Sequence, residues 1–422
     1  MGYSCLAQVG KWVMSHWKPF DHSRTIYQMC LLSLLVGPLV VEAQSPRVAF
    51  VTSVNGSGNL GSWADAGGAV GAEAGDAICR ARAIAAGLAN AGSFVAWLST
   101  TTDDAYCRLH GITGKKADNC GQMQLPIDAG PWNRTDGAPF TESIDRLLNP
   151  ERVVYYPLAT DEFGDPVAGM TFSGTSNDGA WLPSYGTCSD WTVSSPVFAW
   201  KGNSTRGSGG WTSDGNFRCD GTAHLFCFEP GSGPALSPPD EAGNIGFVTS
   251  TNSTGNLGGL TGADAVCQTR AAAAALPDAS TYRAWISTST TDAVDRFQHL
   301  GPVIRPDGIK IAHSLEDMVD GQLLASINLT ETGVYLGHSA AWTGSDASGQ
   351  LSGASCDDWT SNSAGITTWS GATDGSDLTW TMQWGLYCNS VLPRLYCVGD
   401  SSVIFTSSFL FGDTSAWSST VP

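Results

Sequence analysis

The chain has 422 residues, of which 42% are hydrophobic and 14% are charged. The apolar fraction is high enough to form buried cores, which excludes an intrinsically disordered chain. The formal net charge of −18 opposes binding to nucleic acids and to anionic membrane surfaces, because both attract patches of lysine and arginine. At about 100–200 residues per domain, the length favours two domains.

The first 43 residues have the pattern of a secretory signal peptide. An apolar run of 13 residues, 29–41, follows three basic residues and is shorter than the roughly 20 residues that cross a bilayer. We predict cleavage after Ala43; a single membrane anchor is the alternative, which Pro38 and the short run oppose. Cleavage leaves ten cysteines, an even number that predicts disulfides in a secreted or cell-surface protein without a transmembrane segment.

The remaining sequence contains a duplication. Shared motifs occur in the same order in both copies while their offset falls from 197 to 188 and then to 168 residues, so one fold is predicted twice, with loop insertions in the first copy. The copies are residues 46–229 and 244–400, and the Pro/Gly-rich segment 230–243 is predicted to be an exposed linker. The matched motifs are Phe50–Ser53 with Phe247–Ser250, Gly58–Gly61 with Gly255–Gly258, Cys79 with Cys267, Ala96–Thr100 with Ala284–Thr288, and Cys188–Thr192 with Cys356–Thr360.

Both copies show the same α+β pattern. A short strand, Val48–Ser53 or Ile245–Ser250, leads through a Gly/Asn turn into an Ala-rich helix. In the second copy Thr261 is expected at the helix N-cap, Pro277 is expected to stop the helix, and Tyr282–Ser287 is expected to be a strand. Short β segments separated by Gly, Ser, Asn and Asp follow. We therefore expect one or two helices packed on an irregular antiparallel sheet.

The second copy also carries an ordered set of motifs, which lie at Cys267, Thr281–Ser287, Pro302–Ile304, Asp317–Gly321, Trp342–Gly349, Cys356–Trp359, Tyr387–Cys388 and Leu395–Val398. With this set, residues 244–400 resemble the endostatin domain of collagens, and still more its bacterial secreted relatives. The resemblance implies a fold like that of C-type lectins. It extends to residues 46–229 through their match to the second copy, although the middle of the first copy diverges.

The resemblance further implies nested disulfides, in which the first cysteine of a domain pairs with the last and the two middle ones pair together. Cys107 and Cys120 are the two further cysteines of the first copy. They flank a short segment, so we expect them to form a disulfide with each other. The expected bridges are Cys79–Cys227, Cys188–Cys219, Cys107–Cys120, Cys267–Cys397 and Cys356–Cys388.

Catalytic motifs are absent from the sequence. It contains no Gly-x-Ser-x-Gly, His-Glu-x-x-His, Cys-x-x-Cys or P-loop pattern. Two pairs of adjacent acids invite an acid/base interpretation, but neighbouring residues of a strand point to opposite faces, so turn acids or helix caps are favoured. The acids are Asp103-Asp104 and Asp357-Asp358, and the five histidines after residue 43, none at metal-ligand spacing, are His110, His224, His299, His313 and His338.

The sequence offers few signs of a metal or sugar site. Some endostatins bind zinc through N-terminal histidines, which the start at Gln44 lacks, and the calcium motifs of C-type lectins are missing. Thr373–Asp377 offers oxygen ligands for weak Ca²⁺ binding, with an Asx-rich turn as the favoured alternative. Trp191 and Trp359 are expected beside a disulfide; for Trp342, Trp369, Trp380 and Trp384 a core position is favoured over a sugar-stacking platform. No cofactor is predicted.

We therefore expect a non-catalytic binding or adhesion protein that recognises extracellular protein or glycan. The alternatives are a glycan hydrolase with an unrecognised carboxylate site and a purely structural surface protein. Endostatins bind heparin through arginine clusters, yet residues 244–400 have 6 basic and 15 acidic residues, so we expect no binding of heparin-like polyanions and a preference for neutral glycans or proteins. The segment 401–422 is similar to tails of exported bacterial proteins; a role in export or surface sorting and a frayed polar end are both open.

Overall fold

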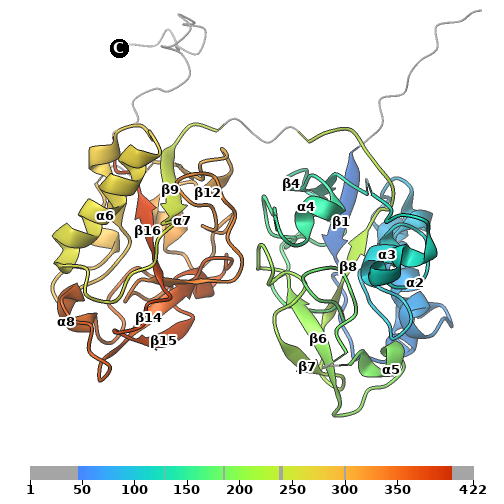
Figure 1. Ribbon diagram of the computed structural model, residues 1–422. Coiled ribbons are helices and arrows are strands. Elements are labelled where there is room, and N and C mark those ends of the chain that lie inside the picture. Colours follow the sequence, from blue (N-terminus) through green and yellow to red (C-terminus); the bar gives the residue numbers. More distant parts are fainter. Residues whose placement is uncertain (1–45, 128, 184–185, 237–240, 299–300, 402–422) are drawn as a thin grey trace, which may run out of the picture. The chain divides into compact units, whose positions relative to one another are not determined.

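The structure is a computed structural model that describes residues 46–127, 129–183, 186–236, 241–298 and 301–401 (Figure 1). The described residues form one compact unit that contains two eight-stranded sheets, one in each copy of the duplication. We call residues 46–229 the first half and residues 244–400 the second half. The described residues include no helix long and apolar enough to cross a membrane. The signal peptide predicted for residues 1–43 and nearly all of the C-terminal tail lie outside the described residues.

The first half is built on a mixed sheet with the strand order β4-β3-β1-β8-β5-β6-β7, with β2 also paired to β8. Its strands are β1 (Arg47–Val51), β2 (Val95–Ala96), β3 (Trp132–Arg134), β4 (Pro139–Thr141), β5 (Met170–Phe172), β6 (Phe198–Asn203), β7 (Asn216–Arg218) and β8 (His224–Phe228). Its helices are α2 (Gly71–Ala85), α3 (Ala105–Leu109), α4 (Ile144–Leu147) and the turn α5 (Cys188–Trp191), with 3₁₀ segments η1 (Leu60–Ser62), η2 (Ala64–Ala66), η3 (Ala91–Ser93) and η4 (Lys116–Gly121).

The second half repeats this sheet with the order β12-β11-β9-β16-β13-β14-β15, with β10 paired to β16. Its strands are β9 (Asn244–Val248), β10 (Arg283–Ala284), β11 (Val303–Ile304), β12 (Lys310–Ala312), β13 (Ala340–Trp342), β14 (Thr367–Ala372), β15 (Trp384–Tyr387) and β16 (Arg394–Val398). Its helices are α6 (Gly259–Ala273), α7 (Leu315–Met318) and the turn α8 (Cys356–Trp359), with 3₁₀ segments η5 (Ala279–Thr281), η6 (Val294–Arg296) and η7 (Leu378–Trp380).

The α+β class is confirmed, but the expected antiparallel sheet is wrong in part. Strands β1 and β3 are parallel, as are β5 and β8, and the same two parallel pairings recur in the second half. The expected strand Tyr282–Ser287 is reduced to Arg283–Ala284, although Trp285 N still donates to Tyr396 O at 2.9 Å. Hydrophobic alternation therefore predicted where strands occur along the sequence, but it did not predict the direction or the length of each strand.

Helix α6 begins and ends earlier than expected. It starts at Gly259, two residues before the predicted N-cap Thr261, because Gly258 and Gly259 adopt positive φ angles of 80° and 74° that glycine tolerates. The helix ends at Ala273, and Ala275 at φ 54° turns the chain away before Pro277 is reached. The backbone at the two glycines, rather than a hydroxyl side chain, sets the start of this helix.

Each sheet is buried on both faces. On β1, Ala49 and Val51 belong to one apolar cluster and Phe50 to another, as expected from the two-residue period of a strand. Strand β9 repeats this with Phe247 and Val248 in separate clusters. Helices α2 and α6 each lie against the central strands on the face that holds the phenylalanine (Figure 1).

Five disulfides join the cysteines in the five expected pairs, Cys79–Cys227, Cys107–Cys120, Cys188–Cys219, Cys267–Cys397 and Cys356–Cys388. The long bridge of each half ties the helix, α2 or α6, to the last strand, β8 or β16. Every bridge closes within one half. Disulfides therefore fasten each half internally, and they do not link the halves to one another.

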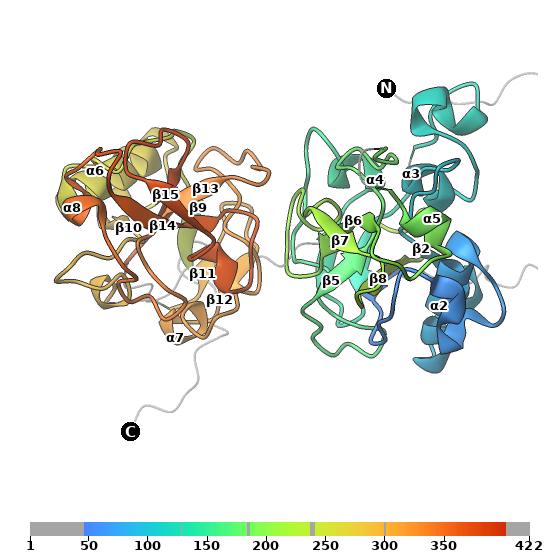
Figure 2. The ribbon, with the colours of Figure 1, turned by 90° about the horizontal axis from the view of Figure 1, so that it is seen from below.

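The Cys-x-x-Trp motif of each half forms a left-handed turn. In α5 and α8 all four residues have positive φ angles, of 50–68° and 52–65° respectively, although none of them is glycine. Left-handed backbone costs about 1–2 kcal/mol per non-glycine residue, so neighbouring contacts have to offset several kcal/mol. A disulfide at the first position and a fully buried tryptophan at the fourth supply them; Trp359 Nε1, for example, donates to Ser287 O at 2.7 Å. In both views α8 lies beside α6 (Figures 1 and 2).

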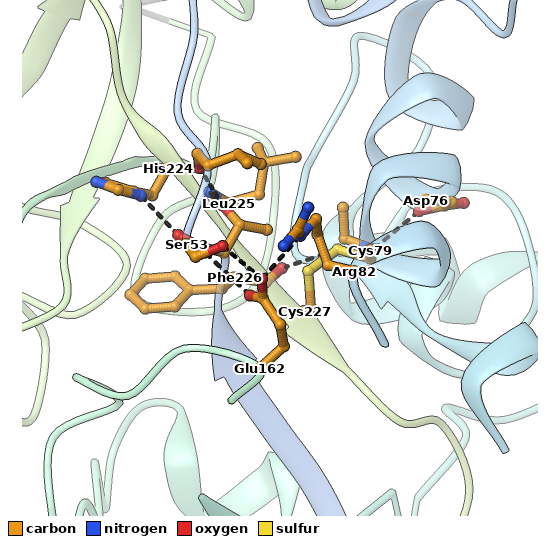
Figure 3. The surroundings of a disulfide bond; sticks show 12 residues. Ser53, Asp76, Cys79, Arg82, Glu162, His224, Leu225, Phe226 and Cys227 are labelled. Atoms are coloured by element: carbon orange, nitrogen blue, oxygen red, sulfur yellow. Dashed lines mark hydrogen bonds and ion pairs between the residues drawn. A yellow bond between two sulfur atoms is a disulfide. The ribbon is translucent and has the colours of Figure 1, made fainter. Parts of the chain in front are cut away.

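A buried glutamate crosslinks each half, and in the first half it lies next to the long disulfide (Figure 3). The side chain of Glu162 is fully buried and accepts hydrogen bonds from Ser53 N at 3.0 Å, from the Ser53 hydroxyl and from Arg82 Nε at 2.7 Å. Glu331 repeats the arrangement with Ser250. These carboxylates join the end of the first strand to a distant loop, so their role in the fold is structural.

The two halves contact each other through a small shared cluster and a set of hydrogen bonds. Val153, Tyr155 and Tyr156 of the first half pack with Ile309 and Ala325 of the second. Several hydrogen bonds accompany this cluster, among them Gly207 N to Asp374 O at 2.6 Å, Ser376 N to Thr205 O at 3.0 Å and Arg305 Nη1 to Val154 O at 3.1 Å. The described residues of the linker are exposed or partly exposed, and its start is held by a hydrogen bond from Gly233 N to Gly130 O at 2.9 Å.

Candidate ligand-binding cavity

A cavity of about 480 Å³ opens beside the shared cluster and is lined by both halves. The first half contributes the β3–β4 hairpin and the loop that follows Tyr156. The second half contributes the start of α7, the loop after it and residues of β12. The polar lining residues are Arg134, Asp136, Tyr156, Thr160, Glu241, Lys310, His313, Asp317, Asp320, Gln322 and Ser376.

The wall from the first half is a fixed arrangement of charges. Arg134 forms an ion pair with Asp136 and donates through Nη1 to Pro157 O at 3.0 Å, and its guanidinium lies 5.8 Å from the ring centre of Tyr156. Burial tends to raise the pKa of Asp136, but the hydrogen bonds and charge of Arg134 outweigh it and hold that pKa below its usual value. Burial raises the pKa of the Tyr156 phenol. Asp136 is therefore an ionised acceptor and Tyr156 a neutral phenol at neutral pH.

The opposite wall, from the second half and the end of the linker, contains one ion pair and two further carboxylates that accept backbone hydrogen bonds. Lys310 Nζ lies 3.0 Å from Glu241 Oε2, and Lys310 N donates to the Tyr156 hydroxyl at 3.2 Å. Asp317 accepts from His313 N at 2.6 Å, an arrangement that orders the turn before α7. Asp320 is exposed and accepts from the backbone of Gln322 at 2.9 Å.

The cavity therefore presents many hydrogen-bonding groups and a small negative excess. Four carboxylates face two basic side chains and one histidine. Ion pairing accounts for two of the carboxylates, so acceptors outnumber charged donors. Such a lining suits a ligand rich in hydroxyl or amine groups, and it opposes a sulfated or phosphorylated one.

The paired acids of the sequence lie elsewhere and stabilise turns. Asp104 is buried and accepts from Lys116 N at 2.7 Å and Trp181 N at 2.8 Å, while Asp103 accepts from Gly114 N at 2.6 Å. Asp358 accepts hydrogen bonds from the Ser289 hydroxyl at 2.6 Å and from Ser289 N at 2.7 Å, and these hydrogen bonds lower its pKa. Asp357 is exposed on the left-handed turn. The interpretation of these residues as turn acids and caps agrees with the contacts.

The histidines and the candidate calcium loop also have structural partners. His110 and His224 each bond a backbone carbonyl through Nδ1, at 2.8 and 2.7 Å. In the loop Thr373–Asp377, Asp374 is fully buried and lies 2.8 Å from His338 Nδ1 and 3.5 Å from Arg206 Nη1. No group of three or more potential metal ligands occurs in the described ranges. His313 lines the cavity, and His299 lies outside the described residues.

The tryptophans divide between core and partial exposure. The two tryptophans of the Cys-x-x-Trp motifs and two of the four proposed platforms are fully buried, at Trp191, Trp359, Trp342 and Trp380. Trp369 and Trp384 are partly exposed, and His338 packs edge-on against Trp384 at 4.9 Å. None of these tryptophans lines the cavity.

Sequence reasoning missed the cavity because its lining comes from separate halves. Arg134 and Asp320, for instance, stand 186 positions apart in the sequence, and no motif links them. The only signal was local: Asp317–Gly321, one of the motifs of the resemblance, contributes two of the lining residues.

No family model matches the sequence, and no curated protein is significantly similar to it.

Proposed function

We propose that this chain is a secreted, non-catalytic binding protein with two endostatin-like domains of the C-type-lectin type, and that it recognises a neutral glycan or a protein outside the cell. The resemblance of residues 244–400 and the five disulfides support the domain type and the compartment. The observation that carries the binding role is the polar cavity at the junction of the halves.

The chemistry of the cavity favours binding over hydrolysis. A glycan hydrolase needs a carboxylic acid whose pKa is raised so that it can protonate the leaving group. Asp136 has the opposite shift because of Arg134. Burial raises the pKa of Asp76, but this residue lies on α2, is paired with Arg108 of α3 at 2.8 Å and does not line the cavity.

Binding of the full chain to an array of neutral, amino and sulfated oligosaccharides and extracellular proteins tests the proposal. Gln322 is exposed and lines the cavity, so Gln322→Arg should fill it and weaken binding at least about tenfold. Gln122→Arg is the matched control, because Gln122 is an exposed glutamine outside the cavity, and it should leave binding unchanged. Silence on the array would support a structural role instead, and turnover of a bound glycan would support the hydrolase.

A further inference from the structure

The surface of the long helix beside the loop after the first strand is covered on α2 in the first half and open on α6 in the second half. The first half has nine additional residues, Ser62–Val70, between the Gly-Asn-Leu-Gly motif and helix α2. Part of this insertion forms η2, which packs on α2, and Ala66 within it is 1% exposed. The second half lacks the insertion, and a groove of about 330 Å³ lies at the corresponding place, between α6 and the loop after β9.

The exposure of equivalent residues shows that the groove is uncovered. Ile78 of α2 is fully buried, whereas its counterpart Val266 on α6 is partly exposed. Ala265 and Thr269, which line the groove, are exposed. Helix α6 can be followed in Figure 1 beside β9 and β16.

The insertion in the first half also supplies a carboxylate. Arg82 of α2 is paired with the buried Glu162 at 2.7 Å and with Asp65 of the insertion at 3.4 Å, and 19% of its side chain is exposed. The counterpart Arg270 lines the groove, is 34% exposed, and has one described carboxylate within 4 Å, Glu331 at 3.9 Å. The groove thus offers an apolar helix face and an arginine that lacks its second acidic partner.

The C-terminal tail has the composition and the length to fill this place. Residues 402–422 contain one acidic side chain, Asp413, which follows the apolar run Phe409–Phe411. Leu395 lines the groove and Ser401 lies six residues further on, or about 20 Å along an extended chain. The twelve residues from Ser401 to Asp413 span up to about 40 Å. This is twice the distance of about 20 Å from Ser401 back to the groove at Leu395.

We propose that the segment Phe409–Asp413 docks in the groove on α6, with its apolar side chains on Val266 and its carboxylate on Arg270, and so takes the place that the insertion fills in the first half. Because the tail is tethered, its effective concentration is in the millimolar range, and a weak intrinsic affinity suffices for occupancy. An unrelated protein that presents the same apolar-acidic segment is the competing occupant. The inference does not depend on the ligand cavity.

The test is to measure hydrogen exchange on α6 in two chains. One is the full chain, with its mass verified; the other ends at Ser401 and keeps every described strand and helix. We expect the amides of residues 262–270 to exchange several-fold faster without the tail. In the full chain Ala265→Arg, which obstructs the groove, should reproduce this loss of protection. Ala273→Arg, at an exposed alanine outside the groove, should not.

A synthetic peptide of residues 402–422 tests recognition separately. It should bind the chain that ends at Ser401, and Arg270→Gln should weaken that binding about fivefold, whereas Arg218→Gln, at an exposed arginine of the first half, should have no effect. Equal exchange with and without the tail would overturn the proposal and leave the groove to another protein. Peptide binding that neither Ala265→Arg nor Arg270→Gln weakens would overturn it as well.

Discussion

Replacing the buried glutamate of each half by glutamine should destabilise the first half more than the second. Glu162 accepts three hydrogen bonds, from the backbone and hydroxyl of Ser53 and from Arg82. Glutamine keeps one acceptor oxygen but turns its amide N–H groups toward one of these donors. In Glu162→Gln a donor therefore faces a donor in a site that water does not reach, and Arg82 loses its closest carboxylate.

The size of the loss follows from the partners that remain. Removing one member of a buried ion pair costs about 3–5 kcal/mol. Arg82 keeps Asp65 at 3.4 Å and is 19% exposed, so we expect about 2–3 kcal/mol for Glu162→Gln. Glu331→Gln breaks the equivalent contacts with Ser250, but Arg270 stands 3.9 Å away and is 34% exposed, so about 1 kcal/mol is expected.

Urea unfolding with disulfides intact measures the total loss, and hydrogen exchange on peptides from each half assigns it. Glu162→Gln should lower protection in the first half by about 1–2 kcal/mol more than Glu331→Gln lowers it in the second. Ser53→Ala and Ser250→Ala remove the hydroxyl common to both sites and should have equal effects. Equal losses from the two glutamine variants would refute the assignment of the difference to the arginine.

Four further outcomes follow from the contacts described. Replacing Cys79 and Cys227 by alanine should lower the free energy of unfolding by about 4–5 kcal/mol in the chain-entropy model, measured by urea unfolding. Burial tends to lower the pKa of His338, but its hydrogen bond to Asp374 outweighs burial and raises that pKa. The stability that the protonated His338 contributes is complete below about pH 6.5 and is lost as the pH rises through the raised pKa. His338→Gln should therefore destabilise the chain more at pH 5.5 than at pH 9. The full chain should elute from a heparin column below physiological salt, and retention beyond it would restore a polyanion-binding role. Residues 244–400 secreted alone should fold with both bridges formed; aggregation despite correct bridges would mean that the shared cluster is indispensable.

The sequence was informative where local pattern determines structure. The Phe-Val-Thr-Ser repeats predicted the central strands β1 and β9, and the Ala-rich segments predicted α2 and α6. The direction of the strands could not be predicted from the sequence. Parallel pairing, as between β1 and β3, depends on the path of a long connection and not on the residues of either strand.

The functional surfaces were less accessible to sequence reasoning. The cavity combines Arg134 with Asp320, whose proximity depends on packing between the halves. The positive φ angles of Cys356–Trp359 were not predicted, because none of these residues is a glycine, the residue that usually indicates left-handed backbone. The groove on α6 was implicit in the missing nine residues, but its exposure becomes visible only when Val266 is compared with Ile78.

The confinement of every disulfide within one half has a consequence for biosynthesis. Cys227, the last cysteine of the first half, precedes Cys267 by 40 positions. At about 5–20 residues per second, an exported chain would bring the six cysteines of its first half into the oxidising compartment roughly 2–8 s before Cys267. Disulfide formation takes seconds or longer, so the first set has time to begin closing alone. In an exported chain, the order of the cysteines would therefore limit mispairing between the two similar halves, because the first set could begin to pair before the second set arrives.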